Sequence, residues 1–381
     1  MREDNKAAPF LEALRLIEPL IAEHRSTFDV ARQLHESVFE ALAEGGFFRL
    51  WLPASLGGPE LSPLAFMSVV ERAAALDGAV GWLVGNGGGM SRVGGYLPEA
   101  VVRSWFQNHR AFVVSATGAV GTAIPVDGGF RVSGRWPFGS GAPHGTHFMG
   151  LVTIGENQVP DQPRYCCYFE RKQVKIHDTW HVSGLRGTGS ADWEVVEAYV
   201  PADWTHPFIG NIPKDNALLY RIPALSAWTV AVVPLGIARG AIDSFAALAE
   251  AKGRLGTVGV MRDREVVQAM VGRVESLYQS ARAFLIQAMT ELMNAIDIGG
   301  DRLVEARLGL RTAAAHAAET ASRIVDMLAA EAGAEAIFEG NALERAVRDV
   351  QAASKHIAMN PSIFVTAGRV KLGLEVGPAR F

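Results

Sequence analysis

The hydrophobic pattern of this chain changes its period twice, and that change limits the folds that the chain can adopt. Near the N-terminus apolar side chains recur at helical spacing, as Phe10, Leu14 and Ile17 do. After Phe112 short β-rich runs are broken by Gly, Pro and Asp, and beyond Pro213 the helical period returns. The predicted fold is mainly α with a middle β-domain, in three parts: an N-terminal helical domain at 1–111, a middle β-domain at 112–213 and a C-terminal helical bundle at 214–381.

Local signals specify these parts further. Asp127, Gly128 and Gly129 predict a hairpin turn between two strands, so the middle runs are expected to form an antiparallel sheet or small barrel. In the C-terminal part, long Ala-rich amphipathic segments with short connections predict an antiparallel four-helix bundle. These segments cover residues 235–251, 266–296, 303–332 and 343–359.

Composition excludes several classes of partner. The chain is 49% hydrophobic and 20% charged, which is typical of a globular protein rather than a disordered one. A formal net charge of −4, with Lys and Arg scattered along the chain, gives no basic footprint for nucleic acid. No apolar run is long enough to span a membrane, and residues 1–6 are polar with no apolar signal core behind them. Cys166 and Cys167 are adjacent, which disfavours an intrachain disulfide, so we expect a soluble cytoplasmic protein.

A Ser-Gly turn after one predicted strand is the first candidate site. Residues 134–141 read Gly-Arg-Trp-Pro-Phe-Gly-Ser-Gly. Glycines on both sides of Ser140 allow a flat ligand to approach the backbone, and the hydroxyl can donate or accept a hydrogen bond. An ordinary strand end explains the same turn, and Trp136 and Phe138 are residue types that usually fill a core.

Two further stretches are rich in glycine. Residues 185–192 read Leu-Arg-Gly-Thr-Gly-Ser-Ala-Asp, and they have neither the sequence of a phosphate loop nor the strand-to-helix setting of a dinucleotide fingerprint. They are interpreted either as an exposed turn or as a cradle of backbone and hydroxyl groups beside a flat ring. Residues 85–89, Gly-Asn-Gly-Gly-Gly, indicate only a flexible or closely packed loop.

Histidines and arginines supply the remaining candidates. His356 lies in a segment of helical pattern, where a lone histidine is usually structural, but imidazole titrates near neutrality and suits general base work. His144 and His147 follow the Ser-Gly turn and are second candidates. Arg262 and Arg264 are predicted to open a long helix, where such charges are usually on the surface, although a guanidinium also suits a phosphate. No run of residues has the spacing of metal ligands, so no metal site is predicted.

Six motifs, in order and over nearly the whole chain, resemble those of the acyl-CoA dehydrogenase superfamily. They lie within residues 44–58, 76–82, 127–141, 184–190, 235–241 and 343–356. The resemblance implies an N-terminal helical domain, a middle β-domain and a C-terminal four-helix bundle. The strand that ends in Ser140 and the Gly-Thr-Gly-Ser loop look most like the oxygenase component of two-component flavin-dependent monooxygenases.

This resemblance implies a chemistry. Such oxygenases take reduced FMN or FAD from a separate reductase, form a C4a-hydroperoxyflavin with O2, and hydroxylate aromatic, heteroaromatic or polycyclic small molecules. By resemblance Ser140 lies by the reactive flavin nitrogen, and His356 acts as base or orienter at the substrate. The flavin-binding residues so implied are Phe138, Ser140, Gly141, Thr188, Gly189, Ser190 and Arg262. A homotetramer or homodimer is also expected from the superfamily.

The chain departs from its apparent relatives in two places. Several hydroxylases have a histidine about two turns after the position of Trp82, where this chain has Met90 after a glycine-rich run, so the pocket wall differs. The dehydrogenases place a catalytic carboxylate after their Arg-Asp pair, where this chain offers Lys355 and His356, which argues against acyl-CoA oxidation. Two alternatives stay open here: an acyl-CoA dehydrogenase-like FAD enzyme that desaturates an acyl thioester, and a helical assembly protein without chemistry.

Overall fold

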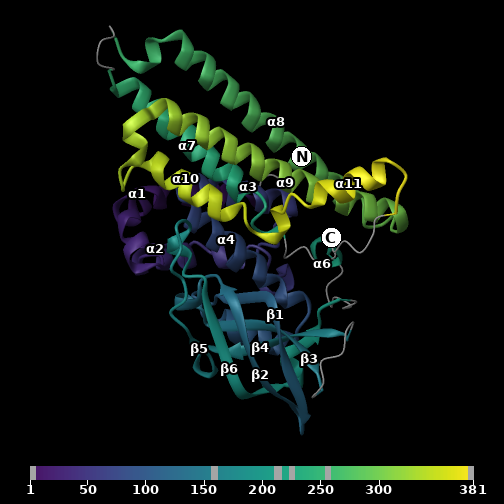
Figure 1. The fold of residues 1–381 in the computed structure, drawn as a ribbon. Coiled ribbons are helices and arrows are strands. Elements are labelled where there is room, and N and C mark those ends of the chain that lie inside the picture. The colour runs from purple at the N-terminus through teal and green to yellow at the C-terminus, as the bar shows by residue number, and fades with distance from the viewer. Residues whose placement is uncertain (1–5, 156–161, 210–216, 223–227, 254–258, 376–381) are drawn as a thin grey trace. The chain divides into compact units, whose positions relative to one another are not determined.

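The computed structural model describes residues 6–155, 162–209, 217–222, 228–253 and 259–375. The elements follow the predicted order of helices, strands and helices, which confirms the fold class (Figure 1). The chain divides into two compact units. Unit 1 comprises Met1–Phe66, Trp82–Val182 and Arg186–Thr229, and unit 2 comprises Met67–Gly81, Ser183–Leu185 and Val230–Phe381.

The regular elements have the following bounds. The helices are α1 (Ala8–Ala31), α2 (Glu36–Glu44), α3 (Pro63–Leu76), α4 (Gly78–Met90), α5 (Glu99–Phe106), α6 (Leu218–Arg221), α7 (Val233–Ala251), α8 (Glu265–Ala295), α9 (Gly300–Ala332), α10 (Ala342–Ala353) and α11 (Ile363–Lys371). The strands are β1 (Val113–Val126), β2 (Gly129–Gly139), β3 (His147–Ile154), β4 (Arg164–Glu170), β5 (Lys175–Ile176), β6 (Ala191–Pro201) and β7 (Thr205–Pro207). The predicted boundary between 213 and 214 lies outside the described residues, and the three domain ranges stay predictions.

The strands of unit 1 form one seven-stranded sheet in the order β5-β6-β2-β1-β3-β4-β7. The predicted hairpin joins β1 and β2: Val126 pairs with Gly129, and Gly128 has the positive φ of +72° that a two-residue turn favours. The sequence predicts an antiparallel sheet, but one pair of neighbours differs, because β1 and β3 run parallel. The reason is that β2 lies between them in sequence and serves as the return connection that parallel neighbours require.

Aromatic side chains fill the core on one face of this sheet. The rings of Trp136 on β2 and Trp193 on β6 stack at 4.4 Å, and both residues are fully buried with Phe148 and Phe169 beside them. A Cβ at Gly150 would lie 2.5 Å from the Trp136 ring, so that position has room only for glycine. Trp136 is therefore a core residue, which is the ordinary role of its residue type.

The glycine-rich run at residues 85–89 is helical and lies within α4, so the predicted loop is wrong. The sequence also allows for close packing of this run, and close packing explains why it is rich in glycine. A Cβ at Gly87 would lie 2.5 Å from the Phe112 ring, and a Cβ at Gly89 would lie 2.2 Å from Thr229. Tertiary packing here outweighs the low helix propensity of glycine.

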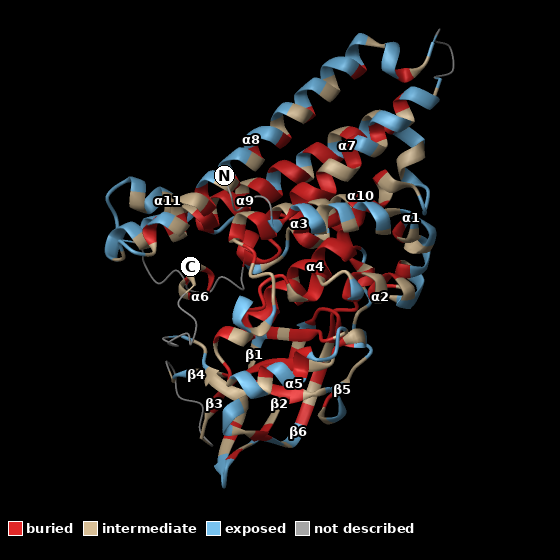
Figure 2. Cartoon of the chain, turned by 180° about the vertical axis from the view of Figure 1, so that it is seen from behind, coloured by how far each residue is buried: buried red, intermediate tan, exposed pale blue. Residues whose placement is uncertain are grey.

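Unit 2 is a helical bundle in which α9 contacts α7, α8 and α10. Figure 2 shows buried residues along α7 and α9, whereas α8 presents a largely exposed outer side. Small side chains on α9, among them Ala313, Ala317 and Ala321, are fully buried or nearly so and permit close helix approach. The first three predicted bundle helices are confirmed, but the fourth ends at Ala353 instead of reaching Met359.

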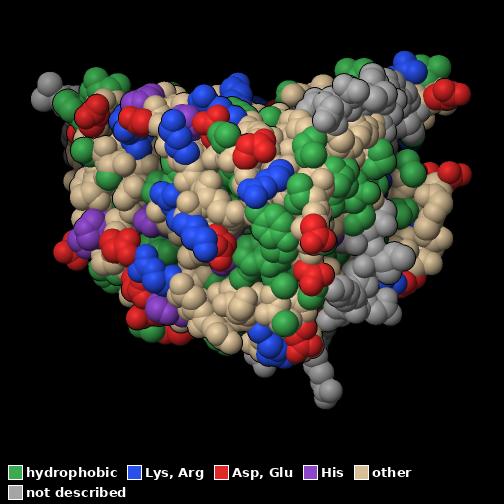
Figure 3. All heavy atoms as spheres, turned by 90° about the horizontal axis from the view of Figure 1, so that it is seen from below, with side chains coloured by type: hydrophobic (Ala, Val, Ile, Leu, Met, Phe, Trp, Pro, Cys, Tyr) green, Lys and Arg blue, Asp and Glu red, His purple; other side chains and the backbone are tan. Residues whose placement is uncertain are grey.

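Charges of both signs are mixed on the surface. Figure 3 shows Lys, Arg, Asp and Glu side chains interspersed over one face, with no large field of a single sign. That face offers no basic stripe of the kind that follows a polyanion. In the described ranges, no helix has both the length and the apolar character needed to cross a membrane. Cys166 and Cys167 are buried in β4 as free thiols.

Candidate functional site

Three hydroxyl groups form a buried chain at the end of β2. Oγ of Ser140, the residue after β2, lies 2.8 Å from Oγ of Ser190. Oγ of Ser190 lies in turn 2.7 Å from Oγ1 of Thr188. The indole N–H of Trp82 on α4 donates to Oγ of Ser140 at 3.0 Å. The fold of unit 1 thus brings together three predicted site residues from two segments that are distant in sequence, and all three are buried.

Glycines hold the two segments of this hydroxyl chain close together. The N–H of Gly141 donates to the carbonyl of Thr188 at 2.8 Å. Gly141 and Gly189 have positive φ angles of +79° and +54°, which favour glycine. A Cβ at Gly141 would lie 2.4 Å from the Phe112 ring, and one at Gly189 would lie 2.8 Å from Pro143. A side chain is therefore excluded at both glycine positions.

Phe138 is an exposed aromatic residue two positions before Ser140. It is 66% exposed, and its ring meets that of Trp180 edge-on at 6.4 Å. Its φ of +62° lies in the left-handed region, which is uncommon for a bulky residue and persists only where the surroundings impose it. An exposed ring, two turns that contain glycine and a buried set of hydroxyls fit a flat heteroaromatic group such as a flavin.

His356 does not lie on a helix, contrary to the prediction. α10 ends at Ala353, and His356 has an extended backbone and precedes the short 3-10 helix η12 (Ile357–Met359). Its Nδ1 accepts a hydrogen bond from the N–H of Ala358 at 3.2 Å, in the manner of an N-cap. Pro361 disfavours helical backbone at Asn360, so a helix is not expected to continue beyond Met359.

The imidazole of His356 is neutral at pH 7. Burial lowers the pKa of His356 to about 4, and the positive charge of Arg311 adds to that effect. Because Nδ1 accepts from the backbone, we assign the proton of the neutral ring to Nε2. Lys355 and Met359, on either side of it in sequence, line an open groove of about 880 Å³ between α9 and α10. The ring is therefore a weak base at pH 7.

His144 and His147 are packed among aromatic side chains. The ring of His144 stacks on Phe39 and that of His147 on Trp105, each with centroids 4.2 Å apart. Burial lowers the pKa of both histidines to about 4, so both are neutral at pH 7. In the part of the chain that the structure describes, no group of three or more His, Cys, Asp or Glu side chains could hold a metal ion. These two histidines therefore contribute to packing.

Arg262 lies on the surface of unit 2. It belongs to the 3-10 helix η10 (Met261–Asp263), and the long helix α8 begins only at Glu265, with Arg264 as its N-cap residue. Nη1 of Arg262 pairs with a carboxylate oxygen of Glu250 at 2.5 Å, and both side chains are more than half exposed. Such a pair contributes little to stability. A role for Arg262 at a flavin phosphate stays a prediction.

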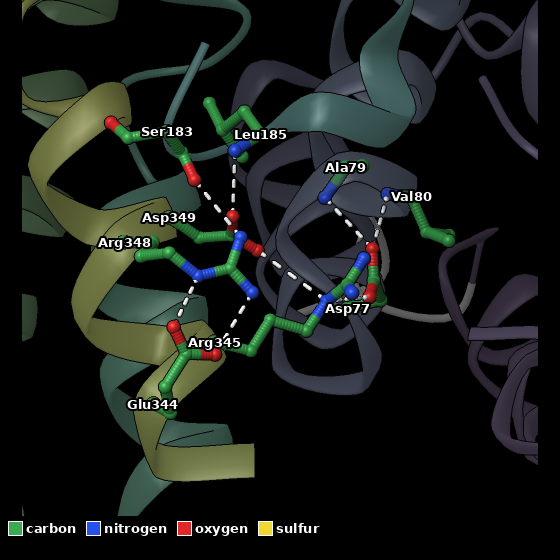
Figure 4. A network of polar contacts seen from close by, with 9 residues as sticks. All are labelled: Asp77, Ala79, Val80, Ser183, Leu185, Glu344, Arg345, Arg348 and Asp349. Carbon is green, nitrogen blue, oxygen red and sulfur yellow. Dashed lines mark hydrogen bonds and ion pairs between the residues drawn. The ribbon is translucent and has the colours of Figure 1, made fainter. Parts of the chain in front are cut away.

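A buried ion network in unit 2 was not expected from the sequence (Figure 4). Oδ1 of Asp77, between α3 and α4, accepts from the N–H of Ala79 at 2.9 Å, and Oδ2 accepts from Nε of Arg345 at 2.9 Å. Oδ2 of Asp349, one turn further along α10, lies 3.7 Å from the same Nε. Oδ1 of Asp349 accepts from the N–H of Leu185 at 2.6 Å. One guanidinium thus has two carboxylate partners.

This network holds the segment that leads into the hydroxyl chain. Arg348 pairs with Glu344 and donates to the carbonyl of Ser183 at 2.9 Å. A Cβ at Gly184 would lie 2.0 Å from the carbonyl oxygen of Arg348, so α10 and this segment are in tight contact. Thr188 and Ser190 follow within six residues. The sequence signal for the network is the i, i+4 spacing of Arg345 and Asp349, which places both charges on the apolar face of α10.

The chain matches known proteins along nearly its whole length. Residues 11–98 match the family described as Acyl-CoA dehydrogenase, N-terminal domain, and residues 228–361 match Acyl-CoA dehydrogenase, C-terminal domain. Indole-3-acetate monooxygenase of Pseudomonas putida is 30% identical over 362 residues, which cover 92% of this chain and 90% of that protein. The flavin-dependent monooxygenase oxygenase subunit HsaA of Rhodococcus jostii (strain RHA1) is 26% identical, with 96% and 99% covered.

A solved structure agrees with these relatives. The 3-HSA hydroxylase from Rhodococcus sp. RHA1 superimposes with a TM-score of 0.86 at 25% identity, and 96% of this chain and 97% of that chain are covered. The relatives are monooxygenases and hydroxylases, which favours oxygen transfer over desaturation of an acyl thioester and over an assembly role without chemistry. The chain therefore belongs to the acyl-CoA dehydrogenase family, in its branch of flavin-dependent monooxygenases.

Proposed function

We propose that this protein is the oxygenase component of a two-component monooxygenase, and that a separate reductase supplies it with reduced FMN or FAD. Its substrate is an aromatic, heteroaromatic or polycyclic small molecule. The observation that carries the proposal is the buried hydroxyl chain of Ser140, Ser190 and Thr188, with the exposed ring of Phe138 beside it in sequence. When flavin is bound, it activates O2 and supplies the oxygen atom to the substrate.

A count of protons is consistent with Ser140 as the hydrogen-bond donor to the flavin. Three hydroxyls carry three protons, and the two contacts among them use two. If Thr188 donates to Ser190 and Ser190 donates to Ser140, then Ser190 and the Trp82 indole occupy both acceptor positions of Ser140. The proton of Ser140 then points out of the chain. In this proposal it is directed at a flavin ring nitrogen, with Gly141 and Gly189 allowing the ring to approach the backbone.

We also propose that His356 orients the substrate. A neutral ring with its proton on Nε2 can donate to a substrate oxygen, and its pKa of about 4 makes it a weak base at pH 7. Of the two roles that resemblance implies for His356, orientation is therefore the one that its surroundings favour. His356→Ala should keep reduced-flavin binding and lose substrate turnover, and turnover equal to that of the parent protein would remove His356 from this role.

The partner proteins are part of the same proposal. An oxygenase that receives reduced flavin needs only transient contact with its reductase, or none if the flavin diffuses freely. A homodimer or homotetramer and a cytoplasmic location are proposed from family resemblance alone. Placing the reductase and the oxygenase on opposite sides of a dialysis membrane that passes flavin tests the contact: substrate oxidation should continue, and its loss would show that the two proteins must meet.

The hydroxyl chain is tested by anaerobic titration with reduced FMN and, separately, reduced FAD. The parent protein should bind at least one of them, and Ser140→Ala should bind it about 10-fold more weakly because one hydrogen bond to the ligand is lost. Ser276→Ala is the matched control, since the exposed Ser276 hydroxyl donates to a carbonyl of its own helix, α8, at 2.8 Å. A parent protein that binds neither reduced flavin would contradict the proposed function.

A further inference from the structure

Arg92 is buried in unit 1, and no described residue gives it a carboxylate partner. It lies in the 3-10 helix η4 (Ser91–Gly95), directly after α4, and is 6% exposed. Its Nη2 donates to the hydroxyl of Tyr96, and its guanidinium carbon lies 5.2 Å from the centre of that ring. Among the residues described, no acidic side chain forms an ion pair with Arg92, and its Nε has no hydrogen-bond acceptor. Its positive charge is thus not balanced by the described protein.

The side chains around Arg92 are neutral at pH 7. The hydroxyl of Tyr168 and Nε2 of His206 lie 2.9 Å apart, and the His206 ring stacks on Tyr96 at 5.1 Å. Burial raises the pKa of both tyrosines, and it raises that of the Cys166 thiol. Burial, together with the charge of Arg92, lowers the pKa of His206 to about 4. The cluster of Arg92, Tyr96, Tyr168 and His206 therefore carries one positive charge and no negative one.

A second unsatisfied donor lies near this cluster. Nε1 of Trp51 is buried and has no acceptor among the described atoms. Tyr220 connects it to the cluster, because its hydroxyl donates to the carbonyl of Trp51 at 3.1 Å and its own carbonyl accepts from the hydroxyl of Tyr96 at 3.2 Å. A group with several acceptor atoms and a negative charge would satisfy donors of this kind.

We propose that Arg92 binds the carboxylate of an aromatic acid that is the substrate of this enzyme. A buried guanidinium without a counter-charge has a large desolvation cost, which a bound anion removes. The planar fork of a guanidinium matches the two oxygens of a carboxylate. The half-buried ring of Tyr96 supplies aromatic surface for the rest of the ligand. This inference rests on the proposed function and gives it a substrate class.

The position of Arg92 relates this anion site to the hydroxyl chain. α4 carries Trp82, which donates to Ser140, and continues directly into η4, which carries Arg92. Ten residues separate Trp82 from Arg92, which is about 15 Å at the helical rise per residue. The same run of helix therefore bears both groups at separate points. A relative that is 30% identical to this chain is an indole-3-acetate monooxygenase, and that substrate is an aromatic acid.

The test compares indole-3-acetate with indole-3-acetamide, which has the same ring and side chain but no charge. Binding to the full chain is measured by calorimetry, first without flavin and then anaerobically with reduced flavin. The parent protein should bind the acid at least 10-fold more tightly than the amide. Arg92→Met should weaken binding of the acid by about 100-fold and leave binding of the amide nearly unchanged. Arg92→Lys keeps the charge without the fork and should show a smaller loss.

Arg103→Met is the matched control. Arg103 lies on α5, is about half exposed and pairs with Glu99, so both affinities should stay as in the parent. Equal affinity of the parent for acid and amide, or binding of neither, would overturn the proposal even if Arg92→Met failed to fold. An unchanged ratio in a folded Arg92→Met would overturn it as well. Failure to bind reduced flavin counts against the proposed function alone, because the acid preference is measured without flavin too.

Discussion

Arg345 in unit 2 and Arg92 in unit 1 are buried to a similar degree, and their surroundings differ in charge. Arg345 has two carboxylates beside it, those of Asp77 and Asp349, and these also accept backbone N–H groups of Ala79 and Leu185. Arg92 has a phenol hydroxyl and neutral rings beside it, and its Nε has no acceptor among the described atoms. Every described partner of Arg92 is uncharged.

The difference shows that two buried guanidinium groups can have different roles. A guanidinium that the fold itself neutralises ties elements together, and removing one member leaves an uncompensated charge behind. A guanidinium that the fold does not neutralise is costly to the folded state and suggests a ligand that completes it. Arg345 belongs to the first kind and Arg92 to the second. Substitutions at the two positions should therefore differ in the size of their effect on the free energy of unfolding.

The largest effect is expected at Arg345. Arg345→Met leaves Asp77 and Asp349 buried without their cation, and should reduce the free energy of unfolding by about 3–5 kcal/mol. Urea denaturation at pH 7 measures this change. Arg262→Met, which breaks the exposed pair with Glu250, should change it by less than about 1 kcal/mol. A loss as small at Arg345 as at Arg262 would mean that the network does not stabilise the bundle.

Acidification should reduce the free energy of unfolding, because it would add a second positive charge close to Arg92, at His206. The pKa of His206 is about 4 in the folded chain against 6.5 for a free imidazole. Between these values the unfolded chain binds the extra proton, so the free energy of unfolding falls as the pH drops below about 6.5, with no effect above it. At pH 5 this contribution is about 2 kcal/mol.

Denaturation at pH 7 and pH 5 checks the acid effect. On acidification the free energy of unfolding of His206→Gln should fall less than that of the parent, by about the contribution given above. His109→Gln, at an exposed position, serves as the control. Binding of an anion at Arg92 should reduce the acid effect in the parent protein. Equal acid sensitivity of His206→Gln and the parent would show that the fold does not lower the pKa of His206.

The smallest effect on stability is expected at Arg92 itself. Arg92→Met removes a buried charge that has no described counter-charge, so the free energy of unfolding should stay within about 1 kcal/mol of the parent or rise. Measured beside Arg345→Met under the same conditions, it should shift the urea midpoint little or upward. A loss of several kcal/mol would place Arg92 with Arg345 as a structural cation and end the contrast between them.

Much of the fold and part of the site could be predicted from local sequence signals. The changes in hydrophobic period mark the order of helices and strands, and Asp127, Gly128 and Gly129 mark the hairpin. Ser140, Thr188 and Ser190 stand out because glycines flank them. Their direct contact depends on the pairing of β2 with β6, which no local signal contains.

Other features depend on contacts between distant segments. The helical conformation of residues 85–89 follows from packing against Phe112 and Thr229, not from propensity. Arg92 stands between Ser91 and Val93 in a sequence that gives no sign of burial. In each case a tertiary contact decides a property that the local pattern leaves open.

The most direct measurement is oxygen-isotope incorporation during turnover. The parent protein, reduced flavin and indole-3-acetate are mixed with ¹⁸O2, and the product is analysed by mass spectrometry. A monooxygenase with the substrate class inferred here places one labelled oxygen atom in the product and the other in water. Oxidised flavin and consumed O2 with no labelled product from the acid would contradict this function for the chain.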